Sequence, residues 1–360
     1  MTTEKQITYW IALAELTQMT TRRKNEILSV AYTNGMTIPE VFDNESLWRM
    51  ANMSDGEIAC VREQSKQLPN TAFLAEDIEN QGYHIIPLND NLRYPQTLKK
   101  HLKSASPLVI YCKGDIRLLQ EPSVAVVGSR KADEQALLFT DNVCRKVTEQ
   151  GKVVVSGFAK GVDQQALVSS LKYNGKSIII LPQGILQAGS TLRTYFPYMS
   201  QGRVLIMSFF PPRMPWSVEC AMARNPVIYG MADTIYVAQS DDKGGTWSGV
   251  LDGIKKQREI FVRVPDNNER VANRQLIDLG GKPVDINGNE VTDTYSDIQE
   301  QLIRLLSTGE YSLKQIKEKL QLTDWKDDAL RAKLNGIENI RIRKSKVNMY
   351  SCQQQQTTLF

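Results

Sequence analysis

Several strand-like apolar runs in this sequence end in glycine, and most of these glycines stand beside a basic or hydroxyl residue. VAVV (124–127) is followed by Gly-Ser-Arg, VVVS (153–156) by GFAKGVD, SIII (177–180) by LPQGI, and the run that ends at 240 by DDKGGT. The candidate binding residues at these exits are Gly128, Ser129, Arg130, Ser156, Gly157, Lys160, Gly161, Asp163, Lys243, Gly244, Gly245 and Thr246.

This combination of residue types suits an anionic ligand, and phosphate above all. Glycine lets the backbone approach a ligand closely, and a turn that opens a helix presents unpaired N–H groups and the positive end of the helix dipole. Arg130, Lys160 and Lys243 add formal charge, and hydroxyl groups donate hydrogen bonds. Glycine at a strand exit also has a purely geometric explanation. Its repeated pairing with cations leads us to favour phosphate or nucleic-acid binding.

Two further candidates are Arg224 and Asn225, which precede an apolar run at 226–239. Arg224 would serve the same anionic groove, or it would form an ordinary salt bridge at a helix start, and the spacing leaves both open. Asp163 stands in the first turn of an expected helix. Holding the loop through backbone N–H groups is at least as good an explanation for it as acid–base chemistry.

The sequence offers little to a catalytic interpretation. It contains no GxxxxGK[ST] phosphate loop, and no GxGxxG follows the first strand of the expected sheet. No nucleophile stands beside a base, and the chain has two histidines and five cysteines without a CxxC pair. We therefore expect a binding protein that is not an enzyme, with no cofactor and no metal site.

The elements that must position these residues alternate between strand-like and helical patterns. Apolar runs at 83–88, 107–114, 123–129, 152–157, 176–182, 203–210, 234–240 and 259–264 are separated by amphipathic stretches such as 132–150 and 246–257. This alternation predicts an α/β fold, a Rossmann-like doubly wound and mostly parallel sheet with both faces covered. Ligands of such sheets bind outside the carboxyl ends of the strands.

The rest of the chain divides into smaller units. Residues 1–66 predict a helical, SAM-like module with Ser54 as a helix N-cap before Glu57. Residues 67–295 form the expected core, in which 267–295, rich in Asn, Gly and Asp, are expected to be a linker or extended loop. Residues 296–352 predict a winged-helix-like module of short helices and a hairpin, and 353–360 a flexible tail.

Bulk properties set the expected compartment. The net charge of +4 permits nucleic-acid binding only if the cations are concentrated. The scattered cysteines are typical of reduced thiols, the N-terminus lacks a signal-peptide pattern, and no apolar run is long enough to span a bilayer. We expect a cytoplasmic protein with no membrane contact.

In this order the motifs resemble the DNA-processing protein A family, also called DprA or Smf. The resemblance runs through RYPQTLKKHLKSASPLVIYCKGD (93–115), VAVVGSRKA, VVSGFAKGVDQQAL, GKSIIILPQGI and ARNPVIYGMADTIYVAQ. It implies a core that binds and protects single-stranded DNA without hydrolysis, assists a RecA-type recombinase during DNA uptake, and forms a homodimer. The cations carried over are Arg130, Lys160, Arg224 and Lys243, with Ser129, and the pocket is shaped by Gly157, Gly161 and Asp163.

The chain departs from the family pattern and resembles a divergent member. Ala166-Leu167 replaces the usual Ala-His, Pro226 replaces the second arginine of Arg-Asn-Arg, and Lys160 stands where arginine is usual. A role in phage defence therefore stays open beside DNA uptake. Two further functions also stay open. One is a nucleotide phosphoribohydrolase of the LOG type, although the loop that corresponds to that of those enzymes reads KGGTW here, and the other is a nucleotide-sensing scaffold. Phe158 or Trp247 would stack on bases or pack in the core.

The last five residues, QTTLF (356–360), form a separate candidate. Gln356, Leu359 and Phe360 resemble the short peptide that docks on the bacterial sliding clamp, with the two apolar side chains filling a pocket. Three matching residues arise easily by chance, so a solvated tail is the preferred interpretation.

Deleting residues 356–360 tests the clamp partnership directly. A solvated tail predicts that the full chain and the truncated chain recover equal amounts of sliding clamp in a pull-down, because no apolar anchor is lost. Recovery that falls only in the truncated chain would instead establish the tail as a docking peptide.

Overall fold

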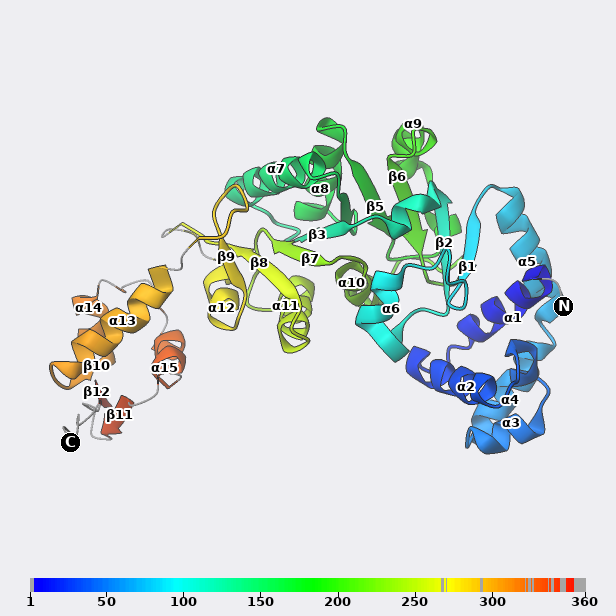
Figure 1. Cartoon of the computed structure of the whole chain (residues 1–360), viewed down its shortest axis with the longest axis horizontal. Helices are drawn as coiled ribbons and strands as arrows, with labels where there is room; N and C mark the ends of the chain where they lie inside the picture. Colours follow the sequence, from blue (N-terminus) through cyan, green and yellow to red (C-terminus); the bar gives the residue numbers. More distant parts are fainter. Residues whose placement is uncertain are drawn as a thin grey trace, which may run out of the picture.

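The computed structural model describes residues 3–266, 269, 271–291, 294–320, 322, 325, 327–335, 337, 340–343 and 348–352. An N-terminal group of helices, a central sheet with its covering helices, and a small C-terminal unit follow one another across the molecule (Figure 1). Within these residues, no helix combines the length and apolar character needed to cross a bilayer.

The central sheet has nine strands in the order β1-β2-β6-β5-β4-β3-β7-β8-β9. Its strands are β1 (His84–Pro87), β2 (Val109–Gly114), β3 (Ser123–Val127), β4 (Val153–Ser156), β5 (Lys176–Ile180), β6 (Val204–Ser208), β7 (Thr234–Val237), β8 (Glu259–Arg263) and β9 (Lys282–Val284). β1 pairs antiparallel with β2, and β2 with β6, while all other pairs are parallel. From β3 the chain winds outward to β6 and then returns to β7 on the other side. The predicted mostly parallel α/β fold is confirmed.

Helices cover both faces of this sheet. They are α6 (Gln96–Leu102), α7 (Glu134–Glu149), α8 (Val162–Lys172), α9 (Phe196–Ser200), α10 (Val218–Met231), α11 (Gly245–Lys255) and α12 (Asn273–Asp278), with short 3-10 turns η2 (Lys103–Ala105), η3 (Ile116–Gln120), η4 (Ile185–Gln187) and η5 (Ser190–Tyr195). Val124 and Val126 of β3 pack with α7 and α8, whereas Ala125 and Val127 pack with α10 and α11. Alternate residues of one strand thus enter different cores, which explains its continuous apolar sequence.

The N-terminal helices are joined to the sheet by a shared core. They are α1 (Thr3–Glu15), α2 (Thr21–Thr33), α3 (Glu45–Met50), α4 (Asp55–Ser65) and α5 (Leu68–Asn80), with a 3-10 turn η1 (Ile38–Val41). Trp10 and Ile11 of α1 lie in the same apolar cluster as Tyr111 of β2 and Ile206 of β6. Ser54 caps α4 and forms the predicted capping box with Glu57.

The expectation of a linker over 267–295 is wrong in the described part of that stretch. It contains α12 and β9, and β9 pairs parallel with β8 at the edge of the sheet, where Pro283 is tolerated. Asn273 accounts for part of the misleading composition. Its buried side chain donates to the Ala238 and Arg263 carbonyls and accepts from the Ser240 N–H, so a polar residue links strand exits instead of marking a loop.

The C-terminal unit has its own small core. Helices α13 (Thr294–Ser307), α14 (Leu313–Lys319) and α15 (Asp327–Asn335) pack with a sheet of β10 (Tyr311–Ser312), β12 (Met349–Cys352) and β11 (Ile340–Arg343), around Leu302, Ile316, Leu330 and Tyr350. β11 and β12 form the expected antiparallel hairpin. Its turn at 344–347 and the tail at 353–360, including Gln356, Leu359 and Phe360, lie outside the described residues.

An ion pair joins α2 to α4 in the N-terminal group. Arg23 Nε lies 2.7 Å from Glu57 Oε1, and Arg23 Nη2 also donates to the carbonyls of Ala51 and Asn52. The hydrogen bond from Arg23 lowers the pKa of Glu57 from its usual 4.5 to about 2; burial opposes this effect, and hydrogen bonds from Ser54 add to it. The ionised carboxylate therefore stabilises the folded module.

Glu57→Gln is expected to destabilise residues 3–80 by about 1–2 kcal/mol at pH 7, a value discounted for solvent screening of this partly exposed pair. Because the pKa is depressed in the folded state, the stabilisation is complete above about pH 4.5 and is lost as the pH falls toward 2. Hydrogen exchange of peptides from this region, followed by mass spectrometry across pH, measures the difference. Glu63→Gln, which removes an exposed pair with Lys66, serves as the control. A difference that does not shrink between pH 4.5 and pH 2 contradicts the prediction.

Candidate nucleic-acid interface

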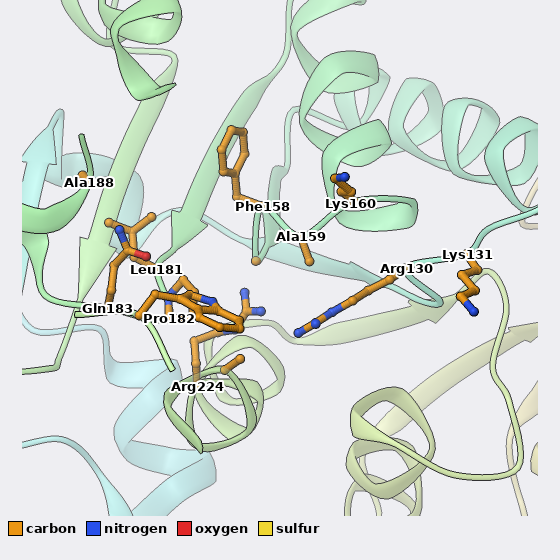
Figure 2. Close-up of a pocket in the computed structure, with 13 residues that line it drawn as sticks. Arg130, Lys131, Phe158, Ala159, Lys160, Leu181, Pro182, Gln183, Ala188 and Arg224 are labelled. Carbon is orange, nitrogen blue, oxygen red and sulfur yellow. The ribbon is translucent and has the colours of Figure 1, made fainter. Parts of the chain in front are cut away.

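A cavity of about 490 Å³ opens where β3, β4 and β5 end and α10 begins. It is lined by Arg130, Lys131, Gly157, Phe158, Ala159, Lys160, Leu181, Pro182, Gln183, Ala188, Trp216, Ala221 and Arg224 (Figure 2). It therefore lies outside the carboxyl ends of parallel strands, the position expected for a ligand site in a doubly wound sheet.

Arg224 on α10 places a guanidinium group in the wall of the cavity, although the residue is only 3% exposed. Its Nη1 donates to the Ile180 carbonyl at 3.0 Å and lies 3.9 Å from Asp163 Oδ2, while its Nε is buried with no hydrogen-bond partner among the described residues. Burial lowers the pKa of Arg224; Asp163 opposes this effect and nearby Arg130 adds to it. A buried and incompletely paired cation of this kind would be stabilised by an anion in the cavity.

The position of the Arg224 guanidinium group requires glycine at position 157. A Cβ atom at this position would lie 1.3 Å from Arg224 Nη1, so only glycine leaves room for the guanidinium group at the end of β4. Gly161 is constrained differently: its φ is +81°, and a Cβ atom would lie 2.4 Å from the Ser129 carbonyl. Both glycines of GFAKG thus permit contacts within the protein that shape the cavity.

Asp163 lies behind the cavity wall and does not line it. Its carboxylate faces Arg224 and lies near the backbone N–H groups of Ala159 and Gly157, which favour its charged form. Burial raises the pKa of Asp163, and Arg224 and these N–H groups oppose the rise. Ser156 is also buried and donates to the Val126 carbonyl at 3.0 Å. Both residues hold the loop between β4 and α8 in position.

Three cations of the cavity are exposed, unlike Arg224. Arg130 and Lys131 come from the loop after β3, and Lys160 comes from the loop after β4. The side chain of Arg130 points toward Arg224, so two guanidinium groups face one space (Figure 2). Two positive groups that face one space favour an anion between them.

The remaining predicted residues support the walls or lie outside the cavity lining. Ser129 accepts from the Lys131 N–H, a Cβ atom on Gly128 would lie 2.6 Å from Val162, and one on Gly245 would lie 2.4 Å from Asn225. Thr246 Oγ1 donates to the Gly128 carbonyl at 3.1 Å, which joins the start of α11 to the exit of β3. Lys243 and Gly244 are exposed, and neither lines the cavity.

Two aromatic residues line the cavity, and the sequence pointed to one of them. Phe158 adopts a positive φ of 61° and packs edge-on against Tyr195. Trp216, in the Pro-rich loop before α10, was missed because it belongs to no periodic apolar pattern. Trp247, the other residue expected to stack on bases, packs partly against the core and does not line the cavity.

Comparison with known proteins agrees with this architecture. The family model for DNA recombination-mediator protein A matches residues 84–296, more than half of the chain. The DNA processing protein DprA of Bacillus subtilis is 26% identical over 51% of this chain and 61% of its own length. The DNA processing protein DprA of Streptococcus pneumoniae is 27% identical over 44% of this chain and 55% of its own length. The chain thus spans about three-fifths or less of the length of these curated relatives.

A solved structure extends the likeness in fold. The DNA processing protein A of Streptococcus pneumoniae superimposes with a TM-score of 0.64 at 22% identity, over 78% of this chain and 94% of that one. The predicted family resemblance is confirmed: this chain belongs to the DNA recombination-mediator protein A family.

Proposed function

We propose that this protein binds single-stranded DNA through its backbone phosphates, in the cavity at the ends of β3, β4 and β5. The observation that carries the proposal is the guanidinium of Arg224, held in the cavity wall against Gly157 and facing the exposed Arg130. Arginine offers a planar set of donors that matches phosphate oxygens, and Lys160 adds a further charge. The family match to DNA recombination mediators supports DNA as the source of the phosphate.

Binding without catalysis is the better-supported role for this cavity. Its lining, among the described residues, contains no carboxylate, histidine, serine or cysteine that would act as a base or nucleophile. The nucleotide-hydrolase alternative depended on the loop at 243–247, which does not line the cavity. A phosphate held here would therefore be bound and left intact.

The wider role follows the family resemblance. We propose that the chain protects single strands and assists a RecA-type recombinase in the cytoplasm as a homodimer, with modules at 1–66 (SAM-like), 67–295 (core) and 296–352 (winged-helix-like) and a tail at 353–360. The hairpin of β11 and β12 beside α13–α15 supports the winged-helix-like assignment. A clamp partner would use the tail alone.

Arg130→Ala/Lys160→Ala is expected to weaken single-strand binding at least about tenfold, because two phosphate contacts are lost. It should also reduce the slope of log affinity against log salt by about 1.4, that is, about 0.7 for each contact. Fluorescence anisotropy with labelled single- and double-stranded oligonucleotides across a salt series measures both quantities. Arg145→Ala, on α7 and outside the cavity lining, is the matched control. Undiminished binding by the double variant would move the site to another module, and no binding by the unmodified protein at low salt would reject the proposed function.

Gly157→Ala is expected to destabilise the core by about 1–3 kcal/mol and to reduce single-strand binding, because the new Cβ atom must displace the Arg224 guanidinium. In an Arg224→Ala background the same change should cost little more, since the clashing group is gone. Denaturant unfolding of the two single variants and the double variant measures this coupling. Gly56→Ala is the control, because its Cβ atom would have no neighbour nearer than 4.0 Å. Additive costs would contradict the assigned role of Gly157.

A further inference from the structure

Trp216 stands apart from the other described tryptophans in its exposure. Trp10, Trp48 and Trp325 are buried at 2%, 5% and 8%, and Trp247 is partly packed, whereas 52% of Trp216 is exposed. This ring lines the same cavity as Arg130, Lys160 and Arg224. A large aromatic surface is thus left in solvent beside the cations that we assign to phosphate.

The backbone that carries Trp216 is tied down on both sides. Before it, the Pro212 and Met214 carbonyls accept from the Leu186 and Gly184 N–H groups at 3.0 and 2.9 Å. A Cβ atom on Gly184 would lie 2.2 Å from the Pro211 carbonyl, so the two loops are in close contact. After it, Ser217 caps α10 by accepting from the Cys220 N–H. The ring is therefore presented from a fixed position, and ordering its side chain on binding involves only two dihedral angles.

Local packing does not account for the position of this ring. A residue before a helix N-cap often packs against the fourth residue of the helix, here Ala221. Ala221 offers only a small methyl group, and about half of Trp216 stays exposed. Val218 and Met222, one turn apart on α10, are also 59% and 44% exposed, so the apolar surface continues along the helix.

Phe158 is less suited to contact a ligand in the cavity. Its ring points away from Arg130 and Arg224 (Figure 2) and is held edge-on against Tyr195 at a centroid distance of 5.6 Å. Trp216 is the aromatic group of the cavity lining with the larger open surface.

We propose that Trp216 is a base-stacking platform, which receives an unpaired base while Arg130, Lys160 and Arg224 hold the adjacent phosphates. A base in a duplex is already stacked on both faces and paired along one edge, whereas a base in a single strand can offer a face to the indole. Trp216 thus makes the cavity selective for single-stranded DNA without reading its sequence. This inference rests on the proposed single-strand binding.

The test separates the base from the phosphate by comparing an oligothymidylate with an abasic oligonucleotide of the same length and phosphate number. The unmodified protein is expected to bind the thymidylate about tenfold more tightly, as one stacked base provides. Trp216→Ala should bind both oligonucleotides alike and keep the salt slope of the unmodified protein, because it removes no charge. Trp216→Phe should retain most of the preference, and quenching of tryptophan fluorescence by the thymidylate should diminish in Trp216→Ala.

Phe73→Ala is the matched control, since it removes another exposed ring, 72% exposed on α5 and outside the cavity lining. It should leave the preference for thymidylate unchanged, and thermal unfolding should show that Trp216→Ala is folded. Equal binding of both oligonucleotides by the unmodified protein, or a preference that persists in Trp216→Ala, overturns the stacking role and leaves phosphate binding in place. Failure of the unmodified protein to bind either one overturns the proposed function as well.

Discussion

The guanidinium group of Arg224 is withdrawn from water at the meeting point of β4, β5, α8 and α10, and several local features exist because of it. A buried cation requires compensation. The Ile180 carbonyl at the end of β5 accepts one of its N–H groups, and Asp163 at the start of α8 supplies the nearby negative charge. The end of β4 must also be free of a side chain, which explains Gly157. Compensation is incomplete at Nε, which has no hydrogen-bond partner among the described residues.

The winding of the sheet brings the other cations to the same place. β3, β4 and β5 are adjacent and parallel, so their carboxyl ends lie at one edge and their exit loops can share one cavity. β7 is also adjacent to β3, but the loop after it turns toward α11 and supports Gly128 through Thr246. Four similar exit sequences therefore acquire different roles: three line the cavity and one supports it from outside.

The site is built on loops that hydrogen bonds hold in place. In the β4–α8 loop, the Ala159 carbonyl accepts from the Gln164 N–H, and the loop before α10 is fixed by backbone hydrogen bonds to Gly184 and Leu186. Rigid presentation reduces the conformational entropy lost on binding. In the proposed function, a flexible single strand loses conformational entropy when it binds. The fixed loops add little to this loss, so that the phosphate contacts and one stacked base can act together.

By itself, the sequence determined the periodicity of the elements, and through it the α/β sheet, and it marked the strand exits as the place to look for Arg130, Gly157 and Lys160. These are local properties, since alternation and turn residues act within a few positions. Tertiary structure alone decided that 282–284 join the sheet, that Arg224 fills the space beside Gly157, that Lys243 stays outside, and that Trp216 lines the cavity. Each of these outcomes depends on packing between segments that are distant in the chain. No local pattern of residue types specifies which of two similar loops will pack against a given distant segment.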